Sequence, residues 1–317
     1  MFKKLNYIWR VLATGFCFLC FGIGGLLLST LVFPLQGLII KDLNRRKITA
    51  RKTVHYSFKF FVSLMQFLGV LGFNTKNIND IKKVQGQLIL ANHPSLIDVV
   101  VLISVIPNAD CIVKAHLFKN PFIRGVVKST GYISNADPEG LLIDCKSALE
   151  AGNNLIIFPE GTRTKPGEKI TFQRGAANIA LRCQANITAI LIKVVPSTLT
   201  KSSPWYRIPS EKAQFTAKLV YNIPDLPEYD KSQTSKYVRQ YSRDLENYFK
   251  ELLVQNEYAI SAMAYGIFEK YNINEYQGDL FKRKNKPNPI FYNELKNLIK
   301  HFMWNWEDYL EKNKLNF

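Results

Sequence analysis

Histidine and cysteine are scarce in this chain: among 317 residues there are four histidines and five cysteines. Cys17 and Cys20 lie three positions apart, but they sit in an apolar stretch where a metal site or a redox pair is not expected. An odd number of cysteines also argues against a framework of disulfides. The cysteine content therefore favours a reducing compartment, with thiols buried among apolar side chains.

Acidic residues are almost missing from the first sixty positions, where Asp42 is the single acid against ten Lys or Arg residues. The whole chain has 42 Lys or Arg and 25 Asp or Glu, which gives a formal net charge of +17. Such an excess needs an anionic partner, which can be nucleic acid, a membrane surface or acidic substrates. More than half of the excess flanks a long apolar stretch, so we expect membrane lipids as the partner and no nucleic acid.

Charged side chains are absent from residues 11–40. This run exceeds the roughly 20 apolar residues that cross a bilayer, and it is much longer than the apolar part of a signal peptide, about 7–15 residues. We therefore predict a retained membrane segment. The basic block that follows, residues 41–52, favours an inner membrane with the body of the protein on the cytoplasmic side. Because both flanks are basic and Pro34 interrupts the run, a simple span and a re-entrant helix both remain open.

A second apolar stretch, residues 57–73, contains one Lys and is short for a membrane span. We predict a helix there that lies in the membrane interface. Residues 1–75 are accordingly expected to form the N-terminal anchor, either as one anchoring helix or as a helical hairpin.

Short apolar segments alternate with helical patterns between residues 76 and 230, the predicted α/β domain. Predicted strands lie within 82–91, 110–115, 129–134, 154–158 and 187–196, and predicted helices cover 96–106, 117–128, 138–151 and 174–183. This alternation is typical of a mixed central sheet flanked by helices, in which loops at the strand ends carry the chemistry.

Residues 231–317 are predicted to form a C-terminal amphipathic helical extension. Apolar and aromatic side chains recur at helical spacing within residues 232–256. A basic loop with prolines follows, and then a second aromatic-rich helical pattern within residues 258–317.

His93 and Asp98 stand five positions apart, directly after a predicted strand. If Ser95 caps the next helix, the Asp98 carboxylate falls where it can turn back toward the strand end and meet the imidazole. A histidine whose Nδ1–H is held by a carboxylate keeps Nε2 free to act as a base. Ordinary helix capping explains the same spacing, so the pair alone is weak support for a site.

The second motif, Phe-Pro-Glu-Gly-Thr-Arg at residues 158–163, follows another predicted strand. An exposed turn explains it simply. As a binding loop, it offers Gly161, which lets the backbone approach a ligand, and Arg163, whose forked donors suit a phosphate.

The two motifs in this order, within a basic chain with an apolar anchor, closely resemble the glycerolipid acyltransferase family. The resemblance covers about residues 55–215 and includes Phe-Gln-Arg-Gly-Ala-Ala at 172–177. It implies acyl transfer from acyl-CoA or acyl carrier protein to a lysophospholipid hydroxyl, foremost that of 1-acyl-glycerol-3-phosphate, giving phosphatidic acid. It implies no cofactor and no metal.

The resemblance also implies residue roles. In the family the motif histidine is the base, which corresponds to His93, and the aspartate that orients it corresponds to Asp98. The acceptor phosphate is bound by the loop of Glu160, Gly161, Thr162 and Arg163. Supporting roles are expected for Asn92, Lys114 and Arg174.

Two features keep alternatives open: the extra 60 residues at the C-terminus and the lack of a cation near Asn135. Family members commonly carry an Arg where this chain has residues near Asn135, without a cation. Another acceptor, such as a lyso-aminolipid or a specialised polyene lipid, is therefore an alternative, with one of the upstream cations compensating (Lys114, Lys119, Arg124 or Lys128). A thioester or phospholipid hydrolase that uses His93 with water or with Ser95 is the other, although no Gly-x-Ser-x-Gly elbow surrounds Ser95.

Overall fold

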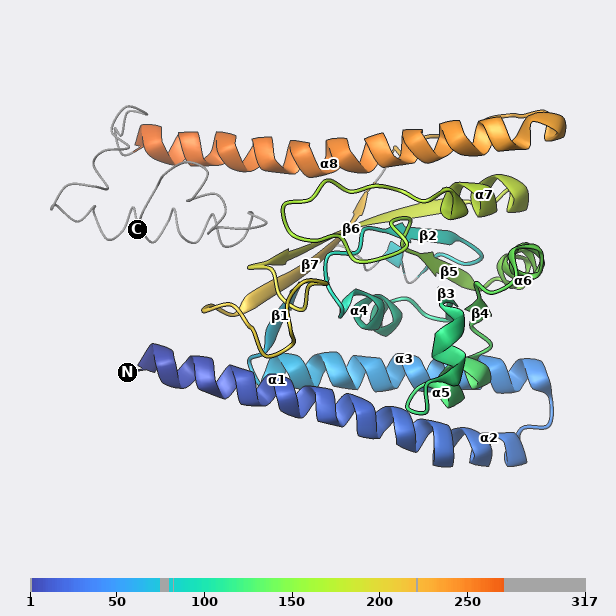
Figure 1. Ribbon diagram of the computed structural model, residues 1–317, viewed down its shortest axis with the longest axis horizontal. Coiled ribbons are helices and arrows are strands. Elements are labelled where there is room, and N and C mark those ends of the chain that lie inside the picture. The colour runs from blue at the N-terminus through green and yellow to red at the C-terminus, as the bar shows by residue number, and fades with distance from the viewer. Residues whose placement is uncertain (1, 75–79, 82, 221, 271–317) are drawn as a thin grey trace, which may run out of the picture.

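The computed structural model describes residues 2–74, 80–81, 83–220 and 222–270. Its centre is a mixed sheet of seven strands in the order β1-β7-β6-β2-β5-β3-β4. Helices cover both faces of the sheet, and a pair of long helices forms one outer layer (Figure 1). The predicted class is therefore confirmed: an α/β fold with a mixed sheet, an N-terminal apolar helix and a C-terminal helix.

The strands are short and mostly buried. Their bounds are β1 Leu71–Asn74, β2 Leu88–Ala91, β3 Ala109–Val113, β4 Ile133–Ser134, β5 Asn154–Ile157, β6 Ile187–Val195 and β7 Ala213–Val220. All neighbouring pairs run parallel except β6 and β7. Parallel strands buried on both faces read as continuous apolar runs, which is why β2 and β5 were recognisable in the sequence.

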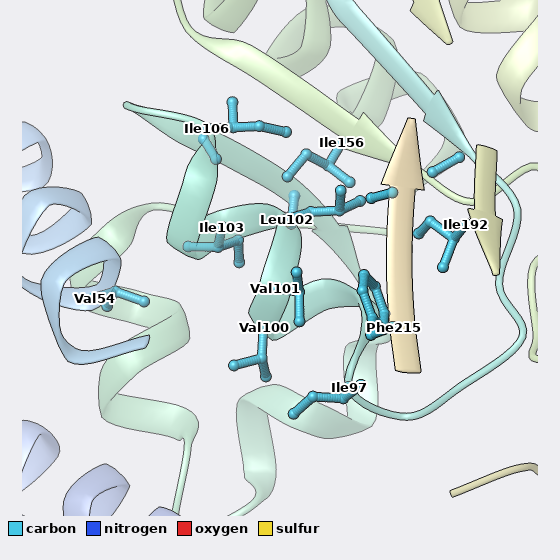
Figure 2. Packing of buried hydrophobic residues seen from close by; sticks show 14 of the residues in the cluster. Val54, Ile97, Val100, Val101, Leu102, Ile103, Ile106, Ile156, Ile192 and Phe215 are labelled. Carbon is cyan, nitrogen blue, oxygen red and sulfur yellow. The ribbon is translucent and has the colours of Figure 1, made fainter. Parts of the chain in front are cut away.

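Alternate residues of each strand enter different cores. In β2, Leu88 and Leu90 pack with helices α6 (Pro138–Glu150), α7 (Arg174–Cys183) and α8 (Thr234–Lys270). Ile89 and Ala91 pack toward α4 (Asp98–Val105) and α3 (Leu43–Phe67). Figure 2 shows this second core, where α4 presents apolar side chains to Phe215 of β7 and to Val54 of α3.

The N-terminal helices form an antiparallel pair beneath α4 (Figure 1). The first comprises α1 (Phe2–Leu27), a π-helical turn (Leu28–Val32) and α2 (Phe33–Ile39). By length and composition, the part from Lys3 to Ile39 could cross a membrane. Pro34 at the start of α2 cannot donate a backbone hydrogen bond, which gives a physical reason for the π-turn just before it.

The predicted interfacial helix at residues 57–73 has the wrong bounds. Helix α3 starts at Leu43, where Asp42 accepts a hydrogen bond from the Arg45 backbone, and it ends at Phe67. Residues 71–74 instead form edge strand β1, which pairs in parallel with β7. No charged residue separates the end of α3 from β1. The apolar residues of the strand therefore could not be distinguished in the sequence from those of the helix.

Other predicted bounds also need correction. Most of residues 129–134 is not strand, because α5 (Arg124–Thr130) continues to Thr130 and only Ile133–Ser134 pair with β3. The expected helix at 117–128 is a 3₁₀ turn, Ala115–Lys119, followed by α5.

Helix α8 closes the sheet face opposite the N-terminal helices. Tyr241, Leu245 and Phe249 are almost fully buried, and the Tyr241 hydroxyl donates to the carbonyl of Pro224 at 2.8 Å. The amphipathic pattern predicted for residues 232–256 is therefore confirmed as a packing helix, although α8 continues to Lys270. The second C-terminal helix predicted from the sequence lies outside the described residues.

Candidate active site

The two sequence motifs meet at one edge of the sheet. His93 follows β2 and Glu160 follows β5, and these strands are parallel neighbours with Leu90 opposite Ile157. Carboxyl ends of parallel strands share an edge, where loops form binding sites in α/β folds. The backbone N–H of Thr164 donates to the carbonyl of His93 at 3.1 Å, so the two loops are joined directly.

His93 and Asp98 are in contact. Nδ1 of His93 lies 2.8 Å from Oδ2 of Asp98, which also accepts the backbone N–H of Ser95 at 2.8 Å. That second bond is half of a capping box. The predicted helix start differs, because α4 begins at Asp98 and Ser95 belongs to the preceding turn. The Asp98 carboxylate therefore both caps the turn at Ser95 and contacts His93.

Asp98 has no exposed surface, while His93 remains partly exposed. Burial raises the pKa of Asp98, and the hydrogen bonds from His93 and from the Ser95 backbone oppose this rise. A buried carboxylate bonded to Nδ1 fixes the imidazole orientation and leaves Nε2 as the ring nitrogen available to a substrate.

Ser95 is fully buried, and its hydroxyl donates to the carbonyl of Thr198 at 3.0 Å. A nucleophile must be accessible and within reach of a base. The hydroxyl of Ser95 is instead used to hold the loop that follows β6.

Glu160 clamps the backbone of the histidine loop. Its carboxylate accepts the backbone N–H of His93 at 2.7 Å through Oε1 and a hydrogen bond from the Thr164 hydroxyl through Oε2. The side chain is 4% exposed, and burial raises its pKa to about 7. The Glu160 carboxylate therefore holds the backbone of His93 and the side chain of Thr164. Its neighbours Gly161 and Thr162 are exposed to solvent.

In the rest of the Phe158–Arg163 loop, one residue packs on His93 and others are exposed to solvent. The ring of Phe158 stacks on the imidazole of His93, with 4.1 Å between ring centroids. Gly161 has a φ of +67°, a conformation that glycine adopts without strain. Thr162 is exposed beside it. The loop thus holds His93 from one side and presents backbone and a hydroxyl to solvent on the other.

Arg163 bridges this loop to the segment after β6. One of its terminal nitrogens, Nη1, donates to the carbonyls of Leu199 and Thr200 at 3.0 and 3.1 Å. No further hydrogen bond of its guanidinium is made within the described residues, so Nε and Nη2 remain open to a ligand. The contact with the 198–200 segment was not anticipated from the sequence, which carries no short-range signal for it.

The supporting residues divide into two kinds. Asn92 is buried, and its amide pairs with the backbone N–H and C=O of Ile192 at 2.7 and 2.9 Å, extending the β2–β6 ladder by a side chain. Lys114 and Arg174 are exposed, and neither bonds to His93 or Glu160 within the described residues. Lys114 follows β3 and therefore lies at the same edge of the sheet as His93.

Asn135 occupies the region where the resemblance leads one to expect a cation. Its side chain accepts the backbone N–H of Ala115 at 3.0 Å, and its own N–H donates to Val113. Asn135 therefore fixes the turn that carries Lys114. Among the described residues, no group of three or more His, Cys, Asp or Glu side chains is arranged to hold a metal ion.

Comparison with known proteins gives a consistent set of relatives. Residues 72–195 match the family model described as Acyltransferase. A 1-acyl-sn-glycerol-3-phosphate acyltransferase of Helicobacter pylori is 36% identical over 133 residues, 40% of this chain and 56% of that protein. The chloroplastic 1-acyl-sn-glycerol-3-phosphate acyltransferase LPAT1 of Arabidopsis thaliana is 26% identical over 160 residues, 46% of this chain and 44% of that protein. The chain thus spans about half the length of these relatives.

A solved structure shares the fold. The crystal structure of the 1-acyl-sn-glycerophosphate acyltransferase PlsC from Thermotoga maritima superimposes with a TM-score of 0.51 at 18% sequence identity. The alignment covers 77% of this chain and 97% of that one.

Proposed function

We propose that this chain, whose residues 72–195 match the family model described as Acyltransferase, transfers an acyl group from a thioester to the free hydroxyl of 1-acyl-glycerol-3-phosphate, forming phosphatidic acid. The observation that carries the proposal is the 2.8 Å contact between His93 and the buried Asp98 at the carboxyl edge of the sheet. The names of the relatives support the acceptor.

His93 acts as the general base. Its Nε2 takes the proton of the acceptor hydroxyl while the oxygen attacks the thioester carbonyl. The carbon–sulfur bond then breaks, and the imidazolium returns the proton to the leaving thiolate. Asp98 stabilises the imidazolium through Nδ1–H. A positioned base contributes roughly 10²–10⁴ in rate, and the thioester is already activated, so no covalent enzyme nucleophile is required.

The acceptor phosphate binds at the 160–163 loop. Nε and Nη2 of Arg163 supply the charged donors, because Nη1 is occupied by the carbonyls of Leu199 and Thr200. The hydroxyl of Thr162 supplies a neutral donor. The N–H of Gly161 donates to the carbonyl of Phe158, so this glycine contributes close approach of the backbone and not a donor. Glu160 acts through the backbone of His93 and does not face the phosphate. Family members commonly carry an Arg near the position of Asn135. We propose that Lys114, which lies in the turn stabilised by Asn135, supplies the positive charge in its place.

The proposal also covers the location of the protein in the cell and the identity of the acyl donor. The helix from Lys3 to Ile39, with its basic flanks, anchors the protein to the inner membrane, and the site faces the cytoplasm. Acyl-CoA or acyl carrier protein provides the thioester as a cosubstrate, and neither a cofactor nor a metal takes part. This arrangement suits a soluble donor and an acceptor that resides in the membrane.

The test is acyl transfer by membranes that contain the wild-type chain, His93→Ala or His116→Ala. Labelled acyl-CoA and acyl carrier protein are offered with 1-acyl-glycerol-3-phosphate and a panel of other lysolipids. We expect phosphatidic acid from wild type, a loss of about 10²-fold or more in His93→Ala, and little change in His116→Ala, which alters an exposed histidine.

Two results would contradict the proposal. Equal activity of wild type and His93→Ala would remove His93 as the base. Release of free fatty acid without an acylated product would make the protein a hydrolase, which must then use water directly because Ser95 is buried and bonded to Thr198.

A further inference from the structure

A cavity of about 440 Å³ lies between α2, the start of α3 and the end of α5. Three cations from two of these elements line it: Arg46, Lys47 and Lys128. Its remaining lining is polar or apolar and contains no acid: Ser29, Phe33, Pro34, Gln36, Gly37, Leu43, Ala50 and Ser129. A concave site of this size with convergent charged groups is suited to a small ligand. We refer to it as the basic cavity.

Two uncharged polar groups of the basic cavity lack a partner. The hydroxyl of Ser29 and the Oε1 atom of Gln36 are buried, and neither makes a hydrogen bond within the described residues. Ser29 belongs to the π-helical turn, a feature that often marks functional positions. Buried polar groups are nearly always hydrogen-bonded in folded proteins, so each unpaired one needs an explanation. Neither atom has surface accessible to water, so both belong to the wall of the cavity and not to its ligand contacts.

The three cations are also unpaired with acids. None forms a salt bridge with an acid in the part of the chain that the structure describes. The guanidinium of Arg46 lies close to Gly37 and the stem of Lys47 lies close to Gly131, while Lys47 and Lys128 are exposed to solvent. The nearest acid that acts on them is Asp110, which interacts with Lys47 at longer range and is already paired with Arg51. Three cations around one cavity therefore favour binding of an anion.

Capping of helix α5 is a simpler use for Lys47 and Lys128, because cations stabilise a helix C-terminus. However, three of the last four carbonyls of α5 are already bonded. The carbonyl of Val127 accepts from Tyr132, that of Lys128 accepts from Gly131, and that of Thr130 accepts from Arg51. Helix capping also leaves Arg46 unexplained.

The basic cavity is separate from the His93 site. Helix α5 ends beside it and leads through Gly131 into the start of β4, which runs parallel to β3. The cavity therefore lies toward the amino edge of the parallel strands, whereas His93 and Glu160 lie at their carboxyl edge.

We propose that the basic cavity binds the phosphate headgroup of an anionic membrane phospholipid. Arg46, Lys47 and Lys128 contact the phosphate. A lipid is favoured over a soluble phosphate because apolar side chains of α2 beside the cavity are highly exposed, with Leu38 at 69% and Ile39 at 80%. An acyl chain can cover this surface while its headgroup occupies the cavity. The site holds the helical pair on the bilayer and does not depend on acyl transfer.

The experiment measures lipid binding to the full chain in a neutral detergent, by native mass spectrometry and by thermal stability. The probes are dihexanoyl-phosphatidylglycerol, dihexanoyl-phosphatidylcholine and inorganic phosphate. Wild type is compared with Arg46→Gln/Lys47→Gln/Lys128→Gln. A matched control, Arg45→Gln/Lys52→Gln/Lys59→Gln, removes three exposed charges of α3 outside the cavity lining. His93→Ala serves as a control for the other edge of the sheet.

We expect one phosphatidylglycerol molecule to bind wild type and to raise its melting temperature. The cavity variant should bind it at least about tenfold more weakly, while the α3 control and His93→Ala bind normally. The proposal is overturned if phosphatidylcholine binds equally well, if the α3 control loses as much affinity as the cavity variant, or if His93→Ala abolishes binding. Inorganic phosphate that binds as tightly as the lipid would identify a soluble anion as the occupant and would also overturn it.

Discussion

Nδ1 of His93 lies 2.8 Å from Oδ2 of Asp98, and the same oxygen accepts the backbone N–H of Ser95. One buried carboxylate therefore both ends a turn and orients an imidazole. The two uses can be separated by substitution, because an amide preserves the shape of the side chain while changing its charge and its donors.

Asp98→Asn should keep the fold and lose activity. One oxygen of Asp98 holds both the Ser95 N–H and Nδ1 of His93. The amide oxygen of Asn can keep both bonds, but it carries no negative charge to stabilise the imidazolium. We expect acyl transfer to fall by about 10²–10⁴-fold, with a small change in melting temperature. The measurement is the rate of phosphatidic acid formation beside a thermal unfolding curve. A variant that unfolds, or one that remains active, would contradict the orienting role.

Glu160→Gln should change how stability depends on pH. Burial raises the pKa of Glu160 from 4.5 to about 7. Between these values the folded protein keeps a proton that the unfolded chain has released, so Glu160 makes wild type less stable as the pH rises through this range. Gln does not titrate, and it can still accept from His93 and donate to Thr164.

The melting temperature of Glu160→Gln minus that of wild type should therefore increase from pH 4.5 to pH 7.5 and then level off. We expect a gain of about 1–3 kcal/mol in unfolding free energy at the upper end. The contribution of Asp110, whose pKa is also raised, is present in both proteins and cancels. The charge of Asp98 helps to raise the pKa of Glu160, so this coupling is part of the measured difference. A constant difference would show that Glu160 has an ordinary pKa.

Arg163→Lys should weaken acceptor binding more than it slows turnover. Lysine keeps the charge, but it cannot hold the carbonyls of Leu199 and Thr200 and a phosphate at the same time. Charge-assisted bonds contribute about 1.5–3 kcal/mol, so we expect the acceptor KM to rise about tenfold or more. Lys165→Gln is the control, since Lys165 pairs with Glu168 on the surface of the same region. Equal KM values for both variants would exclude Arg163 from the phosphate site.

The pair Arg51–Asp110 should be a large contributor to stability. The two side chains are 6% and 1% exposed and lie 2.6 Å apart, joining α3 to β3. Arg51→Met leaves a buried carboxylate without its cation, which costs about 3–5 kcal/mol near neutral pH. Burial raises the pKa of Asp110 to about 6 even with Arg51 present. Without Arg51 this pKa rises further, so the cost should shrink at pH 5, where the carboxyl is protonated.

Two control variants are measured beside Arg51→Met. Arg51→Met/Asp110→Leu should recover much of the loss, because it removes the unpaired charge. Lys83→Met breaks the exposed pair with Asp80 and should change stability by less than about 1 kcal/mol. A pH-independent loss in Arg51→Met would point to lost packing of the side chain and not to the charge on Asp110.

The contact between His93 and Asp98 could be predicted from the sequence because it is local. A strand, a turn and a helix start lie within the eleven residues 88–98, so capping rules suffice to bring His93 and Asp98 together. The parallel strands β2, β5 and β6 were also recognisable, since strands buried on both faces are continuously apolar. Their order in the sheet was not predicted, because parallel neighbours are distant in the chain.

The long-range contacts could not be read from the sequence. The bond from Asn92 to Ile192 and those from Arg163 to the 199–200 carbonyls depend on the order of the strands. Strand β7 was missed although Ala213–Val220 alternates between buried and less buried residues, as expected for a strand near the sheet edge. The Arg51–Asp110 pair was hidden within a basic block that reads as a surface charge cluster.

Glu160 ties the histidine loop to the loop proposed to bind the acceptor, through the His93 backbone on one side and Thr164 on the other. A molecule that displaced the second loop would also withdraw support from the His93 backbone. Evolution toward a different headgroup is constrained in the same way, since remodelling residues 158–164 would also disturb the position of His93. Related proteins that use a different acceptor should therefore differ at residues outside these two loops. Lys114 and Asn135 are examples, because they can change without moving His93.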